Sequence, residues 1–204
     1  MPRGARAQIH FGAILLGIIE GITEFLPISS TGHLLIAEQW LGARSDLFNV
    51  AIQAGAILAV RLVYRRRLRT LATGLSRRED LDYAARLLVA FLITGVLGLI
   101  AVKIGFRLPD TVRPVAWALI LGGLWMLGAE SLAGRFEPCA RIPWAVVIAV
   151  GLAQMAAGIF RGLSRSGATI FAAMLAGTRD RSAATEFSFL VGIPTIFAAS
   201  GYEL

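Results

Sequence analysis

The 204-residue sequence contains one cysteine, Cys139, and one lysine, Lys103. A lone cysteine excludes a disulfide within the chain and a metal cluster held by cysteines. Charged residues are also scarce at 16%, whereas hydrophobic residues make up 56% and the mean hydropathy is +0.70. Because this apolar share exceeds that of a typical soluble domain, we predict an all-α polytopic integral membrane protein.

The net charge of +7 comes almost entirely from arginine. A basic balance can indicate nucleic-acid binding, but no stretch of the chain resembles a folded basic domain. Arginine-rich loops that anchor the chain against membrane lipids explain the charge instead. We therefore expect membrane lipids, and no nucleic acid, as partners.

Length and apolarity predict about six membrane segments. They cover residues 9–25, 47–64, 83–106, 115–132, 143–160 and 183–202. Two further stretches, 25–40 and 160–177, are broken by proline or glycine and then resume as short apolar helices. Irregular backbone at membrane depth is tolerated only inside protein or beside a water-filled cavity, so both stretches are predicted to be re-entrant hairpins.

The two broken stretches also suggest an internal repeat. Each contains a turn of hydroxyl residues and glycine, Ser-Ser-Thr-Gly at 29–32 and Ser-Arg-Ser-Gly at 164–167, followed by a short apolar helix. Thr-Glu-Phe occurs at 23–25 and again at 185–187. Broken segments in corresponding positions of two halves indicate a site at the interface of the repeat.

Arginine placement predicts the orientation of the chain. Six arginines crowd the loop between the second and third segments: Arg65, Arg66, Arg67, Arg69, Arg77 and Arg78. The positive-inside rule places this loop in the cytoplasm. Counting segments from there brings both broken stretches near the outer face, which favours a common site.

Glu20 and Glu24 are four residues apart and share one face of a helix. Two close carboxylates either share a proton or bind a divalent cation. The alternative is that both sit at the headgroup boundary with no further role. Charges inside apolar segments are rare and usually face a cavity, which favours a functional role.

Hydroxyl groups and a histidine follow the glutamates. Ser29, Ser30 and Thr31 precede a glycine turn that can cradle an anion where a helix starts. His33 could activate a nucleophile, act as a general acid, or attack phosphorus itself. The alternative is a histidine at the membrane interface, with the hydroxyl groups capping a helix.

The second broken stretch centres on Arg165, whose guanidinium group matches phosphate oxygens and could stabilise a transition state. Ser164, Ser166 and Thr169 surround it, and an arginine at the outer headgroups is the alternative. Gln53 is predicted to support the site from the second segment. We expect Glu186 to pair with Arg179 or Arg181.

At these residues the chain resembles the undecaprenyl-diphosphatase family, also called bacitracin-resistance proteins. Residues 20–33 match its glutamate-rich signature ending in Ser-Ser-Thr-Gly-His, and residues 162–169 match its second signature. The resemblance covers essentially the whole chain, which we expect to be one membrane-embedded domain, 1–204. Arg161 stands where the family has proline, and relatives usually continue past Leu204, so we expect a domain shortened at its C-terminus.

The resemblance implies hydrolysis of undecaprenyl diphosphate to undecaprenyl phosphate and inorganic phosphate, which recycles the lipid carrier of peptidoglycan and confers bacitracin resistance. It implies inverted re-entrant repeats and a divalent cation, Mg²⁺ or Ca²⁺, held by Glu20 and Glu24. It implies Ser30 and His33 as nucleophile and acid/base in unsettled order. It also implies that Arg165, with Ser164, Ser166 and Thr169, grips the diphosphate. The expected location is the bacterial cytoplasmic membrane, with an outward-facing site.

Three readings remain open at this stage. The first is the phosphatase. The second is a transporter or flippase for a phosphorylated lipid, because paired broken helices are typical of transporters. The third is a non-catalytic member, because the chain stops at Leu204. The residues leave both a monomer and a homodimer open.

Overall fold

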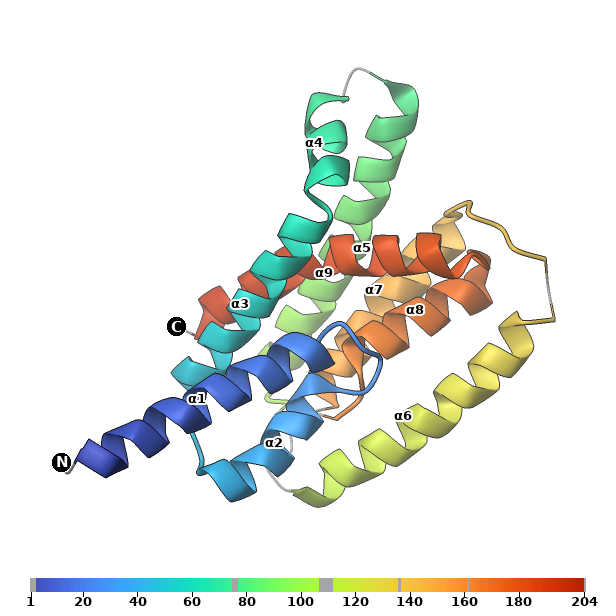
Figure 1. Cartoon of the computed structure of the whole chain (residues 1–204). Helices are drawn as coiled ribbons and strands as arrows, with labels where there is room; N and C mark the ends of the chain where they lie inside the picture. The colour runs from blue at the N-terminus through green and yellow to red at the C-terminus, as the bar shows by residue number, and fades with distance from the viewer. Residues whose placement is uncertain (1–2, 75–76, 107–111, 136, 161, 204) are drawn as a thin grey trace.

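The structure, a computed structural model, describes residues 3–74, 77–106, 112–135, 137–160 and 162–203 (Figure 1). Throughout these ranges the regular secondary structure is helical, which confirms the all-α prediction. The helices are α1 (Arg3–Thr23), α2 (Ser30–Leu41), α3 (Asp46–Val63), α4 (Arg65–Thr73), α5 (Arg78–Lys103), α6 (Val112–Ala133), α7 (Trp144–Ile159), α8 (Arg165–Ala176) and α9 (Arg181–Glu203).

Each of the six predicted membrane segments forms a helix, but their lengths differ. Helices α5, α6 and α9 are long and apolar enough to cross a membrane, and α3 with α4 forms a fourth candidate that is bent by 68°. The apolar parts of α1 and α7 are shorter. Pro27 and Gly162 follow these two helices, and the chain turns back at both places instead of continuing across.

The arginine-rich stretch after α3 is a helix and not a loop. Tyr64 ends α3 and is followed at once by the nine residues of α4. The exposed face of α4 carries Arg65, Arg66 and Arg69, while Leu71 is buried on the opposite face. This amphipathic helix was not predicted, because a cluster of arginines beside a membrane segment usually indicates a cytoplasmic loop. Arginine also favours helix formation, which agrees with the helix that is found.

Two helical hairpins, α1–α2 and α7–α8, enter the fold from opposite ends (Figure 1). The base of the second hairpin lies beside the start of α7, where Thr178 Oγ1 donates to the Arg141 carbonyl over 2.7 Å. The base of the first lies beside the start of α3, where the Arg44 side chain packs against Gly12. The tips of the two hairpins therefore point toward each other.

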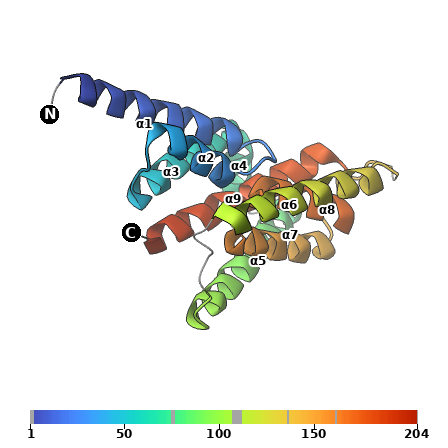
Figure 2. The ribbon, with the colours of Figure 1, turned by 90° about the horizontal axis from the view of Figure 1, so that it is seen from below.

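The main hydrophobic core surrounds α8. Buried residues of α5, α6, α7 and α9 enclose it, including Ala90, Val147, Phe187 and Val191. A smaller cluster joins α3 to α9 through Ile57, Val60 and Ile196. Figure 2 shows α1, α2 and α3 grouped apart from α5, α6, α7 and α8. Helix α9 contacts both groups.

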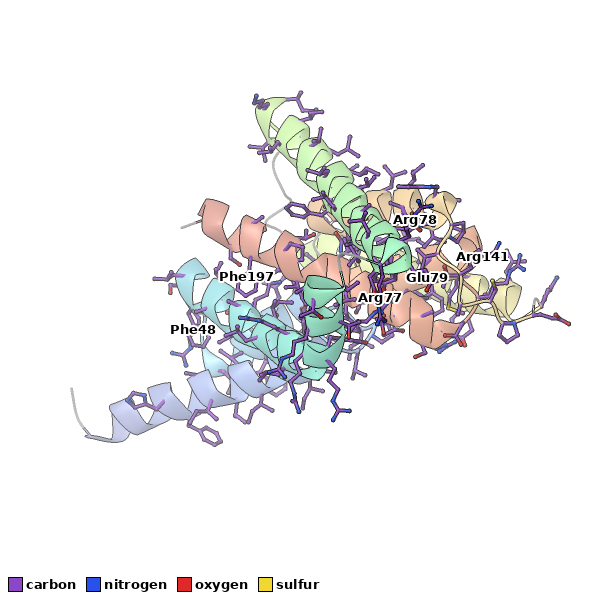
Figure 3. The ribbon with its side chains drawn as sticks, turned by 90° about the horizontal axis from the view of Figure 1, so that it is seen from above. Phe48, Arg77, Arg78, Glu79, Arg141 and Phe197 are labelled. Atoms are coloured by element: carbon purple, nitrogen blue, oxygen red, sulfur yellow. The ribbon has the colours of Figure 1, made fainter. Side chains whose placement is uncertain are left out.

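The arginine-rich end of the fold brings α4, α5 and α9 together. Arg67 Nε donates to Glu186 over 2.9 Å, and a second Arg67 nitrogen lies 3.8 Å from Asp80. Figure 3 shows Arg77, Arg78 and Glu79 together at this end, with Arg141 nearby. Glu186 thus has the structural role that was expected. Its partner is Arg67, however, which lies at the start of α4, while Arg181 pairs with Glu130.

Candidate functional site

The first hairpin tip is a tight turn between α1 and α2. The Ile28 amide donates to the Leu26 carbonyl over 2.8 Å, which closes a three-residue turn around Pro27. Proline suits the centre of such a turn because its φ is fixed near −65°. Ser29 follows with a φ of 66°, a conformation that is costly for a residue with a side chain. Helix α2 then begins at Ser30.

The second hairpin tip is built in a similar way between α7 and α8. Gly162 has a φ of 105°, which glycine adopts without steric cost. Ser164 caps α8, since its Oγ accepts from the Gly167 amide over 3.1 Å. Arg165 is the first residue of α8, and its guanidinium group therefore sits at the tip.

The two halves repeat these features at a constant separation along the chain. Ser29 corresponds to Ser164 as the cap of a 12-residue helix, and Gly42 corresponds to Gly177 as its C-terminal residue of positive φ. The predicted internal repeat is therefore present in this form. The Thr-Glu-Phe pair does not belong to it, because Thr23 ends α1 and residues 24–25 lie in the turn that follows, whereas residues 185–187 lie inside α9.

Among the described residues, three close approaches join the two tips. Arg165 forms an ion pair with Glu24. The Ser166 hydroxyl donates to the Leu26 carbonyl over 3.0 Å. A Cβ at Gly167 would lie 3.2 Å from Pro27 Cβ, so the absence of a side chain there permits the close approach. Residues far apart in the sequence thus form one site.

The site lies about halfway along the longer helices. A Cβ at Gly32 would lie 3.1 Å from the Leu119 side chain, and Leu119 is near the middle of α6. The Phe25 ring lies 5.8 Å from that of Phe189 in α9. Charged groups at this depth are costly unless they serve a site, which agrees with a functional reading.

Glu24 is the centre of the polar cluster. Its Oε2 accepts from the Ser30 hydroxyl over 2.6 Å, while its Oε1 faces Arg165. The Glu24 side chain is only 7% exposed, so both contacts are made away from bulk water. A hydroxyl, a carboxylate that can accept its proton, and a cation that orients the carboxylate together have the composition of an activated nucleophile.

Glu20 lies one turn earlier on α1 and is 1% exposed. Its Oε2 is buried and has no hydrogen-bond partner among the described residues. A buried carboxylate oxygen without a partner is costly, so this atom is suited to a bound cation. The carboxylates of Glu20 and Glu24 offer the oxygen ligands that Mg²⁺ and Ca²⁺ prefer in proteins. The described residues contain no group of three or more acidic, histidine or cysteine ligands.

His33 stands apart from this cluster. Its Nδ1 lies 2.8 Å from the Ser29 carbonyl oxygen, and the ring lines an apolar groove between α1 and α2 with Ile36 and Trp40. No hydrogen bond joins His33 to Ser30 in the described structure. The predicted pairing of these two residues is therefore not seen, since Ser30 is directed to Glu24.

The remaining predicted residues have local roles. Thr169 donates to carbonyl oxygens of its own helix, and Ser29 caps α2. Thr31 is half-buried beside the first tip. Gln53 is half-buried on α3 and makes no side-chain hydrogen bond to the cluster within the described ranges. Arg161 lies outside the described residues.

Sequence reasoning missed two members of the site. The Leu26 carbonyl accepts a hydrogen bond from the Ser166 hydroxyl, and Met126 of α6 packs against Gly167. A backbone acceptor leaves no trace in residue type. The only available signal was Pro27, which marks a turn without showing what the turn faces.

The fold and site define a helical membrane protein with two oppositely directed hairpins whose polar tips meet. A family model described as "Bacitracin resistance protein BacA" matches residues 13–204. This match covers most of the chain, and the chain therefore belongs to the bacitracin resistance protein family.

Curated relatives agree with this assignment. The chain is 66% identical over 195 residues to an undecaprenyl-diphosphatase of Rhizobium etli (strain CIAT 652), covering 96% of this chain and 74% of the relative. It is 64% identical over 192 residues to an undecaprenyl-diphosphatase of Xanthomonas oryzae pv. oryzae (strain PXO99A), covering 94% of this chain and 72% of the relative.

Proposed function

We propose that this protein hydrolyses undecaprenyl diphosphate to undecaprenyl phosphate and inorganic phosphate. The observation that carries the proposal is the buried contact of Ser30, Glu24 and Arg165 where the two hairpin tips meet. The names of the relatives supply the substrate class. Returning the lipid carrier to its monophosphate form would support peptidoglycan synthesis and resistance to bacitracin.

The geometry favours Ser30 over His33 as the nucleophile. The Ser30 hydroxyl gives its proton to Glu24 while its oxygen attacks the terminal phosphorus, and the anhydride P–O bond breaks to release undecaprenyl phosphate. Water then cleaves the phosphoserine and frees inorganic phosphate. Arg165 leaves Glu24 for the phosphate oxygens, where a guanidinium group stabilises the developing charge.

Glu20 and Glu24 are the residues that would hold a divalent cation. When bound, such an ion supplies neutralisation of the diphosphate charge. The buried Glu20 Oε2, which accepts no hydrogen bond from the residues that the structure describes, supports this role without depending on the relatives.

The proposed location is the bacterial cytoplasmic membrane, with the site reached from the outer side. The support is the arginine-rich end formed by α4 and the start of α5, which the positive-inside rule places in the cytoplasm. Phosphate release from substrate added to right-side-out vesicles, but not to sealed inside-out vesicles, is the expected result. The reverse preference would contradict the orientation.

Hydrolysis is tested with purified protein in detergent, undecaprenyl diphosphate and Mg²⁺, by measuring inorganic phosphate. Glu24→Gln is expected to lower kcat at least a hundredfold, because it removes the proton acceptor. Glu130→Gln is the matched control, since Glu130 also pairs with an arginine but is exposed. Equal phosphate release by the two variants would overturn the proposal.

A second candidate is translocation of a phosphorylated lipid, favoured by the inverted hairpins with their site at the meeting point. It predicts movement of a labelled polyprenyl phosphate across proteoliposomes without phosphate release. Phosphate release that is abolished by Glu24→Gln, together with unchanged lipid movement, would decide for the phosphatase.

A further inference from the structure

The hydroxyl of Ser166 joins the two halves of the fold at the site. Ser166 belongs to α8, and its Oγ donates to the carbonyl of Leu26 in the turn after α1 over 3.0 Å. Ser166 is only 9% exposed, so water competes little for this bond. This hydrogen bond joins the two hairpin tips, as the neighbouring ion pair between Arg165 and Glu24 does.

The acceptor, the Leu26 carbonyl, is part of the turn that forms the first hairpin tip. The Leu26 carbonyl also accepts the Ile28 amide, and so it closes the turn around Pro27. The next residue, Ser29, has the strained φ of 66°, and Ser30 follows it directly. A strained turn persists only when its surroundings hold it in place. The bond from Ser166 is one such restraint from outside the hairpin.

The same bond limits what else Ser166 can do. A serine hydroxyl has a single proton to donate. The Ser166 oxygen also lies 3.3 Å from Ser164 Oγ, which caps α8. With its proton directed to Leu26, Ser166 has none left for a phosphate oxygen. Its role therefore differs from the phosphate grip expected from the resemblance.

We infer that Ser166 is a positioning residue, which holds the first hairpin tip so that Ser30 and Glu24 face Arg165. This inference rests on the proposed function for its catalytic consequence. Ser164, Arg165, Ser166 and Gly167 then have four separate tasks: capping α8, pairing with Glu24, holding Leu26, and allowing the approach of Pro27.

The first arm of the test measures kinetics on Ser166→Ala and on Ser166→Cys, which keeps the size of the side chain but donates weakly. Loss of one hydrogen bond is expected to lower kcat about five- to tenfold, with KM changed less than about twofold. Ser166→Thr retains the hydroxyl, and Thr31 occupies the corresponding place in the first tip. It is expected to restore most of kcat.

Ser131→Ala is the matched control, because the Ser131 hydroxyl also donates to a backbone carbonyl but within its own helix and on an exposed face. The second arm measures amide hydrogen exchange over residues 26–33. This exchange is expected to rise severalfold in Ser166→Ala and Ser166→Cys and to stay unchanged in Ser131→Ala.

The outcomes separate the alternatives. A raised KM with unchanged kcat and unchanged exchange would assign Ser166 to substrate contact and overturn the inference. Unchanged kinetics and exchange would also overturn it. If the unsubstituted protein releases no phosphate, the proposed function fails, and the exchange arm still decides whether Ser166 holds the first tip.

Discussion

Glu24 and Arg165 are 141 residues apart in the chain and form an ion pair between the tips of two hairpins that enter the fold from opposite ends. Glu24 is 7% exposed and Arg165 is 24% exposed. Each partner compensates the burial of the other.

Removal of one partner is expected to destabilise the protein. Arg165→Met leaves Glu24 as an uncompensated buried carboxylate, which costs about 3–5 kcal/mol. Arg181→Met breaks the exposed pair with Glu130, which is worth about 0–1 kcal/mol. Thermal unfolding in detergent should therefore show a much lower Tm for Arg165→Met. Similar Tm values for both variants would argue against a buried pair.

Close approach of the hairpins depends on Gly167. A methyl group there would crowd Pro27 and the Met126 side chain, so Gly167→Ala is expected to cost about 1–3 kcal/mol and to lower phosphate release. Met126→Ala should restore part of both in the double variant by opening space. Gly158→Ala is the control, since a Cβ at Gly158 meets open space. If Met126→Ala restores neither stability nor phosphate release, crowding against Met126 is not the cause of the loss.

Ser30 and His33 have different hydrogen-bond partners. Ser30→Ala is expected to abolish phosphate release, because its hydroxyl is the group bonded to Glu24. His33→Gln is expected to lower kcat less than about tenfold, because the ring contacts the Ser29 carbonyl and the groove between α1 and α2. Rapid-quench trapping of phosphoserine supplies the direct measurement. Full inactivation by His33→Gln with near-normal Ser30→Ala would reverse the assignment.

Glu20 is expected to set the dependence on divalent cations. Glu20→Gln should raise the Mg²⁺ concentration for half-maximal activity at least tenfold, because it replaces a carboxylate whose Oε2 has no hydrogen-bond partner in the described part of the chain. The exposed Glu79 provides the control, and Glu79→Gln should leave the Mg²⁺ dependence unchanged. Titration of EDTA-treated protein with Mg²⁺ measures both. Identical curves would remove Glu20 from the proposed ligands.

Much of this site was predictable from residue types. Glutamates, hydroxyls and an arginine in apolar segments are improbable without a role, and breakers beside them indicate turns. Arginine placement predicted that the residues around Glu24 and those around Arg165 share a site, and the contact of Glu24 with Arg165 confirms that they meet. The internal repeat was visible in the Ser-to-Gly turns because the caps of α2 and α8 require those residues.

Other features were not predictable because their signals lie in the backbone or in tertiary packing. The acceptor of Ser166 is a carbonyl, which every residue carries. Arg67 reaches Glu186 only because the chain bends sharply at Tyr64 between α3 and α4. The roles of Ser30 and His33 were left open by their spacing on one helix, which does not show that Ser30 contacts Glu24 whereas His33 contacts the Ser29 carbonyl.

The Arg67–Glu186 pair at the arginine-rich end provides a contrasting case. Both side chains are 33% exposed, and Tyr83 donates to the same carboxylate over 3.3 Å. Solvent screens such a pair, so Glu186→Gln is expected to cost only about 0–1 kcal/mol and to leave kcat unchanged. Thermal unfolding and phosphate release, compared with Glu24→Gln, test this expectation. Loss of activity in Glu186→Gln with an unchanged Tm would show that the arginine-rich end is coupled to the hairpin tips, because the substitution lies outside the proposed chemistry.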